Sequence, residues 1–167
     1  MTDLLIENLA EVATPTGHEP QKGAEQGKVE RKSNVEVLCR DGRILFVGPR
    51  EQRQRLHGDP ERCLDGRGGT LVPGFVDPHS HLPWAGTRAE EFARRLAGAT
   101  YQELAAAGGG ILSTVAATRA ASREELIANV VARLDDMLRG GTTTAEAKSG
   151  YGLALAAEKK QLEALET

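Results

Sequence analysis

Two histidines, His79 and His81, stand two positions apart in a chain that has four histidines. Residues i and i+2 of a β-strand point to the same face, so both imidazoles can reach one cation at the usual Zn–N distance of about 2.0–2.1 Å. A bare His-x-His also arises by chance on surface strands, but here the apolar run 71–76 precedes it. Asp77 has the same parity and could orient one histidine as an acceptor. The spacing therefore predicts a divalent-metal site with His79 and His81 as ligands.

The elements that must position these histidines alternate between the strand and helix periods from residue 70 onward. Capping boxes, in which Ser or Thr precedes Glu by three residues, predict two helix starts. The expected elements are a strand at 70–76, helices opened by Thr100-x-x-Glu103 and Ser122-x-x-Glu125, a helix stop at Gly140-Gly141, a strand at 142–146 and a helix from Ala154. This order predicts an α/β fold with a parallel sheet or barrel. In a barrel, both histidines would face the active-site mouth at the carboxyl end of a strand.

Residues 1–70 have a different pattern and predict a small, mostly β module. Residues 4–12 alternate loosely between apolar and polar side chains, which predicts a strand. Asp41-Gly42 lies between two apolar runs and predicts a hairpin, because both central residues of a type I′ turn need positive φ. Residues 17–34 are polar and charged and predict an exposed loop.

Charge and composition exclude several classes of partner. The 167-residue chain has a net charge of −3 and a pI near 5.8, which provide no basic surface for nucleic acid or anionic membranes. No apolar run approaches the roughly 20 residues needed to cross a bilayer, and the amino terminus lacks a signal-peptide pattern. Cys39 and Cys63 have no paired metal-binding spacing and are expected to be reduced thiols. The sequence thus predicts a soluble cytoplasmic protein.

The same pattern predicts that the chain is the N-terminal fragment of a longer protein. Residues 162–167 fall on an amphipathic helix without a cap. A complete (β/α)₈ barrel takes about 250 residues, so residues 71–167 are expected to form only its first two units. Such a piece would leave sheet edges uncovered, and the chain alone is therefore expected to be inactive.

The stretch 71–81, Leu-Val-Pro-Gly-Phe-Val-Asp-Pro-His-Ser-His, resembles the first barrel strand of the amidohydrolase superfamily. Further stretches resemble the imidazolonepropionase family within it, in the family's order and spacing. They are 84–88, 98–101 with 107–111, and 146–153. The resemblance implies a distorted TIM-like barrel, a small composite β-sandwich to which residues 1–70 contribute, and one divalent ion, Zn or Fe. Ser80 stands where threonine is more usual, and Pro83-Trp84 replaces small or aliphatic residues.

The resemblance assigns Arg88 and Tyr151 to substrate binding. A planar guanidinium can bind a propionate carboxylate with two parallel hydrogen bonds, whereas the alternative for Arg88 is a solvated arginine beside Glu90 and Glu91. Tyr151 lies between glycines after the second strand, and its alternative role is packing. For Tyr101, binding of the carboxylate and packing on a helix are equally open.

Two further features have structural interpretations. Glu146 and Lys148 share strand parity and predict an ion pair; the role of a metal-bridging carboxylated lysine is not carried over, because the family resembles single-metal members. The run Gly108-Gly109-Gly110 is not a phosphate loop, since no Lys-Ser/Thr follows it, and it predicts a flexible turn near the substrate.

The resemblance implies hydrolysis of a carbon–nitrogen bond of 4-imidazolone-5-propanoate to N-formimidoyl-L-glutamate, in histidine degradation. The general acid/base and the other metal ligands are expected beyond Thr167, so no catalytic residue is assigned within the chain. A homodimer of the full-length protein is left open. Two alternatives are also open: another cyclic amidine or amide amidohydrolase or deaminase, or a non-catalytic fragment of one.

Overall fold

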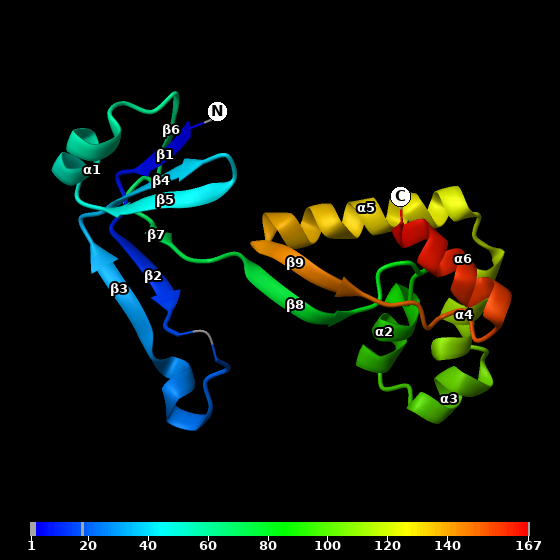
Figure 1. Cartoon of the computed structure of the whole chain (residues 1–167). Coiled ribbons are helices and arrows are strands. Elements are labelled where there is room, and N and C mark those ends of the chain that lie inside the picture. Colours follow the sequence, from blue (N-terminus) through cyan, green and yellow to red (C-terminus); the bar gives the residue numbers. More distant parts are fainter. Residues whose placement is uncertain (1–2, 18, 167) are drawn as a thin grey trace. The chain divides into compact units, whose positions relative to one another are not determined.

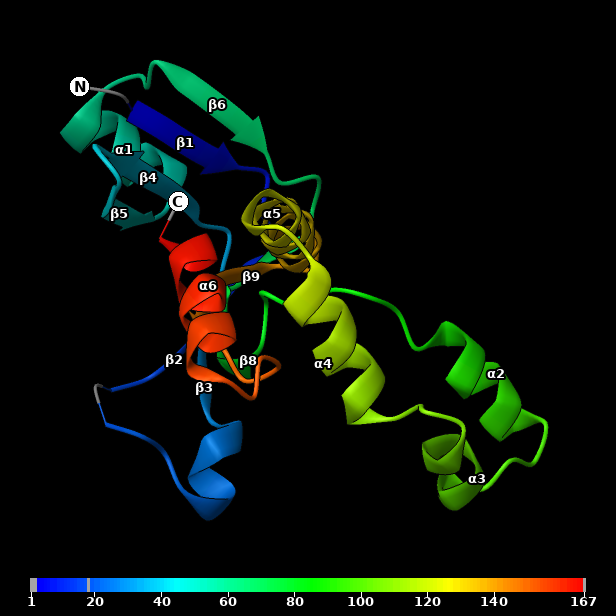
Figure 2. The ribbon, with the colours of Figure 1, turned by 90° about the vertical axis from the view of Figure 1, so that its right-hand side faces the viewer.

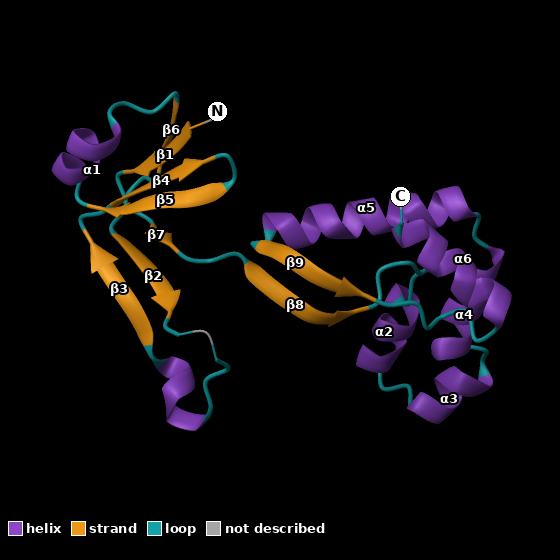
Figure 3. Cartoon of the chain, in the orientation of Figure 1, coloured by secondary structure: helices purple, strands orange, loops and turns teal. Residues whose placement is uncertain are grey.

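A computed structural model describes residues 3–17 and 19–166 of the chain. The chain divides into two compact units, Met1–Pro73 and Gly74–Thr167. Strands dominate the first unit and helices the second (Figure 3). Parallel and antiparallel strand pairs both occur, so the fold is α/β with mixed sheets. The predicted α/β class is thus confirmed. No helix within the described ranges is both long and apolar enough to cross a membrane.

The first unit contains two small sheets with the strand orders β5-β4-β1-β6 and β3-β2-β7 (Figure 1). Its elements are β1 (Asp3–Glu7), β2 (Glu11–Pro15), a 3₁₀ turn (Gly23–Gly27), β3 (Val29–Ser33), β4 (Glu36–Arg40), β5 (Arg43–Gly48), α1 (Arg50–His57), β6 (Arg62–Asp65) and β7 (Thr70–Leu71). The predicted hairpin is confirmed: β4 and β5 are antiparallel, and Asp41 and Gly42 have φ of 47° and 75°. Leu5, Val37 and Leu38 are buried in this unit.

Two predictions for the first unit are wrong. Residues 4–12 do not form one strand, because Asn8, with φ of 54°, separates β1 from β2, and these strands belong to different sheets. The exposed loop expected at 17–34 contains strand β3, which pairs antiparallel with β2. All side chains of β3 are exposed, so backbone hydrogen bonding rather than apolar burial holds this strand. Composition could not reveal it.

The first unit also contains an apolar cavity of about 330 Å³ that Ile6, Val12 and Leu71 help to line. Two charged residues of its lining, Glu30 and Lys32, pair with each other at 3.2 Å. The histidine pair lies in the other unit, so this cavity is not the candidate site.

The second unit is built on the parallel pair β8–β9. Its elements are β8 (Phe75–Ser80), α2 (Ala89–Leu96), α3 (Tyr101–Ala106), α4 (Ile111–Ala120), α5 (Arg123–Arg139), β9 (Thr142–Ala147) and α6 (Leu155–Leu165). Helix α5 lies along β9 and α6 packs against α5 (Figure 1). Helices α2 and α3 lie side by side (Figure 2). Because β8 and β9 pair in parallel, their carboxyl ends adjoin, and both strands are followed by loops.

Local signals fixed the starts of α3 and α5 and the end of α5 as predicted, whereas α2 and α4 were not predicted. Thr100 and Ser122 both form complete capping boxes, in which each side chain accepts from the backbone N–H of the glutamate three residues on. Helix α5 ends at Arg139, just before the two glycines. Leu126 on α5 is fully buried and packs in a core cluster with Ala85, Ala121 and Ala164.

Candidate functional site

The histidine pair stands where β8 ends. His79 lies in the strand and His81 directly follows it, and their ring centroids are 5.6 Å apart at an interplanar angle of 70°. The side chain of Ser80, between them, is not directed at a ligand: its Oγ donates to the carbonyl of Glu146 on β9 at 2.6 Å. This hydrogen bond joins the two strands at the point where the histidines leave the sheet.

His81 is oriented by the loop that follows β9. Its Nδ1 lies 2.7 Å from the carbonyl oxygen of Ser149. A carbonyl only accepts, so Nδ1 carries the hydrogen and the lone pair of Nε2 is free, which is the usual arrangement of a metal-binding histidine. Gly150 packs on the ring: a Cβ there would lie 2.8 Å from Cε1, and its φ is 143°. Only glycine fits this close approach without strain.

His79 is placed differently, beside an ion pair. Its Nδ1 lies 3.2 Å from Nζ of Lys148, which pairs with Glu146 at 2.7 Å. The hydrogen bond from Lys148 holds the pKa of Glu146 below its ordinary value. The predicted Glu146–Lys148 ion pair is thus confirmed. An ammonium only donates, so Nδ1 of His79 is the acceptor of this contact, and this nitrogen could bind a cation only if Lys148 gave up the contact.

The parity of Asp77 suggested that it orients a histidine ring, but the structure shows a different contact. Its Oδ1 accepts the backbone N–H of His79 at 3.0 Å, so the carboxylate fixes the strand end instead. Within the described ranges no group of three or more His, Cys, Asp or Glu could hold a metal ion. The two imidazoles are donors suited to Zn or Fe, and His79 and His81 would supply two ligands.

A cavity of about 150 Å³ lies beside the histidines, lined by Trp84, Arg88, Thr114 and Tyr151. The ring of Tyr151 stands edge-on to His81 at 5.5 Å and lies 6.4 Å from the ring of Trp84. The structure therefore brings Arg88 and Tyr151 together, and Tyr151 also contacts His81. Tyr101 is not part of this lining and is 67% exposed.

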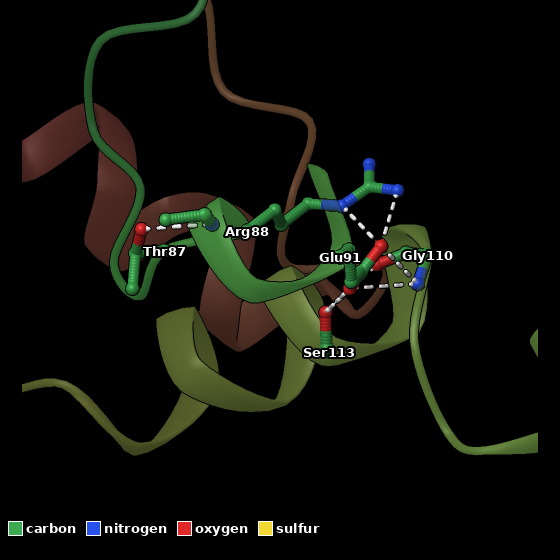
Figure 4. Close-up of polar contacts among 6 residues, drawn as sticks. Thr87, Arg88, Glu91, Gly110 and Ser113 are labelled. Atoms are coloured by element: carbon green, nitrogen blue, oxygen red, sulfur yellow. Dashed lines mark hydrogen bonds and ion pairs between the residues drawn. The ribbon is translucent and has the colours of Figure 1, made fainter. Parts of the chain in front are cut away.

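Arg88 does have the acidic neighbour that the sequence allowed. Its Nε and Nη2 lie 2.9 and 2.7 Å from one oxygen of Glu91, Oε2 (Figure 4). This hydrogen bond raises the pKa of Arg88 above its ordinary value and holds the pKa of Glu91 below its own. The arginine side chain is 46% exposed and lines the cavity, so the ion pair leaves it accessible. Glu91 follows Arg88 by three residues, a spacing at which opposite charges pair on a helix, so the sequence could have predicted this ion pair.

The segment that follows His81 is held by Arg133 of α5, a contact without any local sequence signal. Nη1 of Arg133 donates to the carbonyl of Trp84 at 2.8 Å and also to that of Leu82. The guanidinium carbon lies 3.7 Å from the centroid of the Trp84 ring, within range of a cation–π interaction. Burial lowers the pKa of Arg133. Trp84 is thereby fixed as a wall of the cavity.

The loop that carries Tyr151 is held by Glu158 of α6. Oε1 of Glu158 accepts the backbone N–H groups of Gly152 and Leu153, each at 2.7 Å. Burial by itself raises the pKa of this carboxyl, but hydrogen bonds from Ser149 and from backbone N–H groups outweigh burial and lower the pKa. An acidic residue in the first turn of a helix is a signal that could have identified Glu158 from the sequence.

Replacement of Glu158 by glutamine is expected to lower the free energy of unfolding by about 1 kcal/mol at neutral pH, because two charge-assisted hydrogen bonds weaken. The folded-state pKa is depressed below 4.5, so the stabilisation is present above pH 4.5 and is lost as pH falls through the folded pKa. Denaturant unfolding of both proteins from neutral pH to about pH 3 measures this. Glu166→Gln, at the exposed end of α6, is the control. A Glu158 effect that is equal at every pH would contradict the expectation.

The fold is shared with known hydrolases. No protein-family model matches the chain. Guanine deaminase from Bradyrhizobium japonicum aligns with 99% of this chain and 33% of its own, at a TM-score of 0.62 and 24% identity. An adenosine deaminase from Xanthomonas campestris, with bound zinc, aligns with 99% of this chain and 31% of its own, at a TM-score of 0.59 and 22% identity. At these identities the likeness shows a shared fold and no more.

Curated sequences give a more specific match. The imidazolonepropionase of Symbiobacterium thermophilum is 53% identical over 165 residues, and that of Myxococcus xanthus 49% identical over 164 residues. Each alignment covers 98% of this chain but only 39% and 38% of the respective relative. The chain thus spans about two fifths of the length of these relatives. Over that span, the chain belongs to the imidazolonepropionase family.

Proposed function

We propose that the full-length protein hydrolyses 4-imidazolone-5-propanoate at a site that includes His79, His81, Arg88 and Tyr151. The observation that carries this proposal is the row of contacts from His81 through the Tyr151 ring to the cavity that Arg88 lines. The substrate has a ring carbonyl at one end and a propanoate carboxylate at the other. The row offers imidazole nitrogens for chemistry near the carbonyl and a guanidinium for the carboxylate.

The residues of this chain would bind and orient the substrate. Arg88 binds the carboxylate, and the Tyr151 hydroxyl hydrogen-bonds the substrate between Arg88 and the histidines, which brings the ring carbonyl toward His79 and His81. When bound, a divalent ion such as Zn or Fe, held in part by the two histidines, supplies an electrophile that activates water at neutral pH. Hydrolysis adds one water: its oxygen bonds to the carbonyl carbon, the ring C–N bond breaks, and the nitrogen gains a proton.

The architecture supports a matching proposal for the fold. We propose that residues 71–167 are the first two βα units of an amidohydrolase barrel and that residues 1–70 contribute strands to a composite β-sandwich. The parallel pairing of β8 with β9 and the packing of α5 along β9 support the barrel. The two small sheets of the first unit support the sandwich.

A substrate panel on the metal-loaded full-length protein tests the proposed function. We expect turnover of 4-imidazolone-5-propanoate with loss of the imidazolone absorbance and formation of N-formimidoyl-L-glutamate. Guanine, cytosine and adenosine serve as the competing substrates, with ammonia release as the readout. Ammonia release from one of these bases without opening of the imidazolone would replace the proposal with a deaminase.

A further inference from the structure

Arg88 has two hydrogen-bonding faces, and Glu91 uses only one of them. We propose that Glu91 is a positioning residue: it fixes the Arg88 guanidinium so that the remaining N–H groups on Nη1 and Nη2 can donate to the substrate carboxylate. This inference rests on the proposed function and deepens it by adding the residue that sets the geometry of carboxylate binding. Glu91 itself would not touch the substrate.

The contacts of Arg88 define which face is free. A guanidinium has five N–H bonds: one on Nε and two on each terminal nitrogen. Nε and Nη2 each donate one hydrogen to Oε2 of Glu91, at 2.9 and 2.7 Å (Figure 4). Both hydrogens of Nη1 and the second hydrogen of Nη2 have no acceptor among the residues that the structure describes. These belong to the end of the fork, which matches a carboxylate in two-point geometry.

Glu91 is itself held by groups outside its own helix, so it can act as a fixed support. The backbone N–H of Gly110 lies 3.0 Å from both carboxylate oxygens. The Ser113 hydroxyl lies 3.1 Å from Oε1 and 2.8 Å from the carbonyl oxygen of Gly110, so these two acceptors share its one hydrogen. The Glu91 side chain is only 15% exposed, against 46% for Arg88. The carboxylate also stands at the N-terminus of α4, where its negative charge is favoured.

The glycine run 108–110 provides the space and a backbone N–H donor for the Glu91 carboxylate. A Cβ on Gly109 would lie 2.9 Å from the carbonyl of Leu104 and 3.1 Å from Cδ and Oε1 of Glu91. Gly110, with φ of 79°, begins α4 and presents its N–H to Glu91. Absence of a side chain at Gly109 thus allows the glutamate to approach the backbone. The run has a specific packing role that connects α2, through Glu91, to the start of α4.

A fixed guanidinium benefits binding in a definite way. A free arginine loses rotamer freedom when it binds a ligand, and that loss subtracts from affinity. Here the ordering occurs on folding, because Glu91 holds the side chain before the ligand arrives. The second anion would meet the adjacent edge of the same cation, so the two carboxylates need not compete for the same hydrogens.

The test compares two substrates in full-length enzyme variants. Glu91→Gln keeps the size of the side chain but weakens the support of Arg88, and Glu90→Gln is the matched control on the exposed side of the same turn. We expect Glu91→Gln to lower kcat/KM for 4-imidazolone-5-propanoate by about tenfold, mostly through KM. For the methyl ester of the substrate, which lacks the charge, we expect no change beyond that of Glu90→Gln. Ser113→Ala, which removes one support of Glu91, should give a smaller loss of the same selectivity.

The outcomes separate this inference from the proposed function. Equal losses for the acid and the ester would mean a merely structural role for Glu91 and would overturn the inference, as would Glu91→Gln behaving like Glu90→Gln on the acid. If Glu91→Gln does not fold, Ser113→Ala decides by the same acid-against-ester comparison. A wild-type enzyme that leaves the imidazolone unchanged would overturn the proposed function, and the inference with it.

Discussion

Replacement of His81 by alanine in the full-length protein should reduce kcat by roughly three orders of magnitude or more, together with loss of bound metal. Without the ion, the pKa of the attacking water rises from near neutral toward that of bulk water, so little nucleophile exists at neutral pH. His81 is the better single target of the pair, because its Nδ1 is already oriented by the Ser149 carbonyl. Metal analysis of the purified protein and steady-state kinetics measure the two effects.

A matched control for His81 is available in the other unit. His57→Ala removes an imidazole that packs against the Phe46 ring, at 5.5 Å, and belongs to the first unit. It should leave both metal content and kcat near the wild-type values. Full metal occupancy and unchanged turnover in His81→Ala would rule out the metal-ligand role.

Replacement of Arg88 by methionine should raise KM about 100-fold, because truncation of one partner of a close charge pair costs about 2–5 kcal/mol. Methionine keeps much of the side-chain volume and removes all five N–H donors. The reacting end of the substrate lies near the histidines, so kcat should fall much less than kcat/KM. Initial rates over a wide substrate range give both constants.

Arg95→Met provides the control for Arg88, since Arg95 is an exposed arginine on the same helix. Its KM should stay close to wild type, because it does not line the cavity with Trp84 and Tyr151. An unchanged KM in Arg88→Met would eliminate the carboxylate-binding role. Glu91 would then have no ligand to position.

The parts of the fold that the sequence predicted are those governed by local chemistry. The capping boxes at Thr100 and Ser122 act within three residues, and the Asp41-Gly42 turn is set by the φ values of two residues. The proximity of His79 and His81 follows from strand periodicity alone. Such features depend little on the rest of the chain, so they could be derived without a structure.

The missed features depend on partners distant in sequence. Strand β3 is fully exposed and exists because β2 offers it a hydrogen-bonding edge. Arg133 on α5 binds the segment after His81. The apolar periodicity of α5 predicts which of its side chains are buried, but not this contact. Strand parity predicts that Asp77 meets an imidazole, but its carboxylate accepts the backbone N–H of His79 instead. Periodicity gives the direction of a side chain and not the group that it meets.

The joint between β8 and β9 has a consequence for how the site comes into being during folding. Ser80 and Glu146, which join the two strands, are 66 residues apart in sequence, and the two strands run parallel. Non-local parallel contacts require a large loop to close first, so they form late and slowly compared with the helices between them. We therefore expect the histidines and Tyr151 to meet late in the folding of this unit. Hydrogen exchange should show helix amides protected before the amides of β8 and β9 in refolding full-length protein.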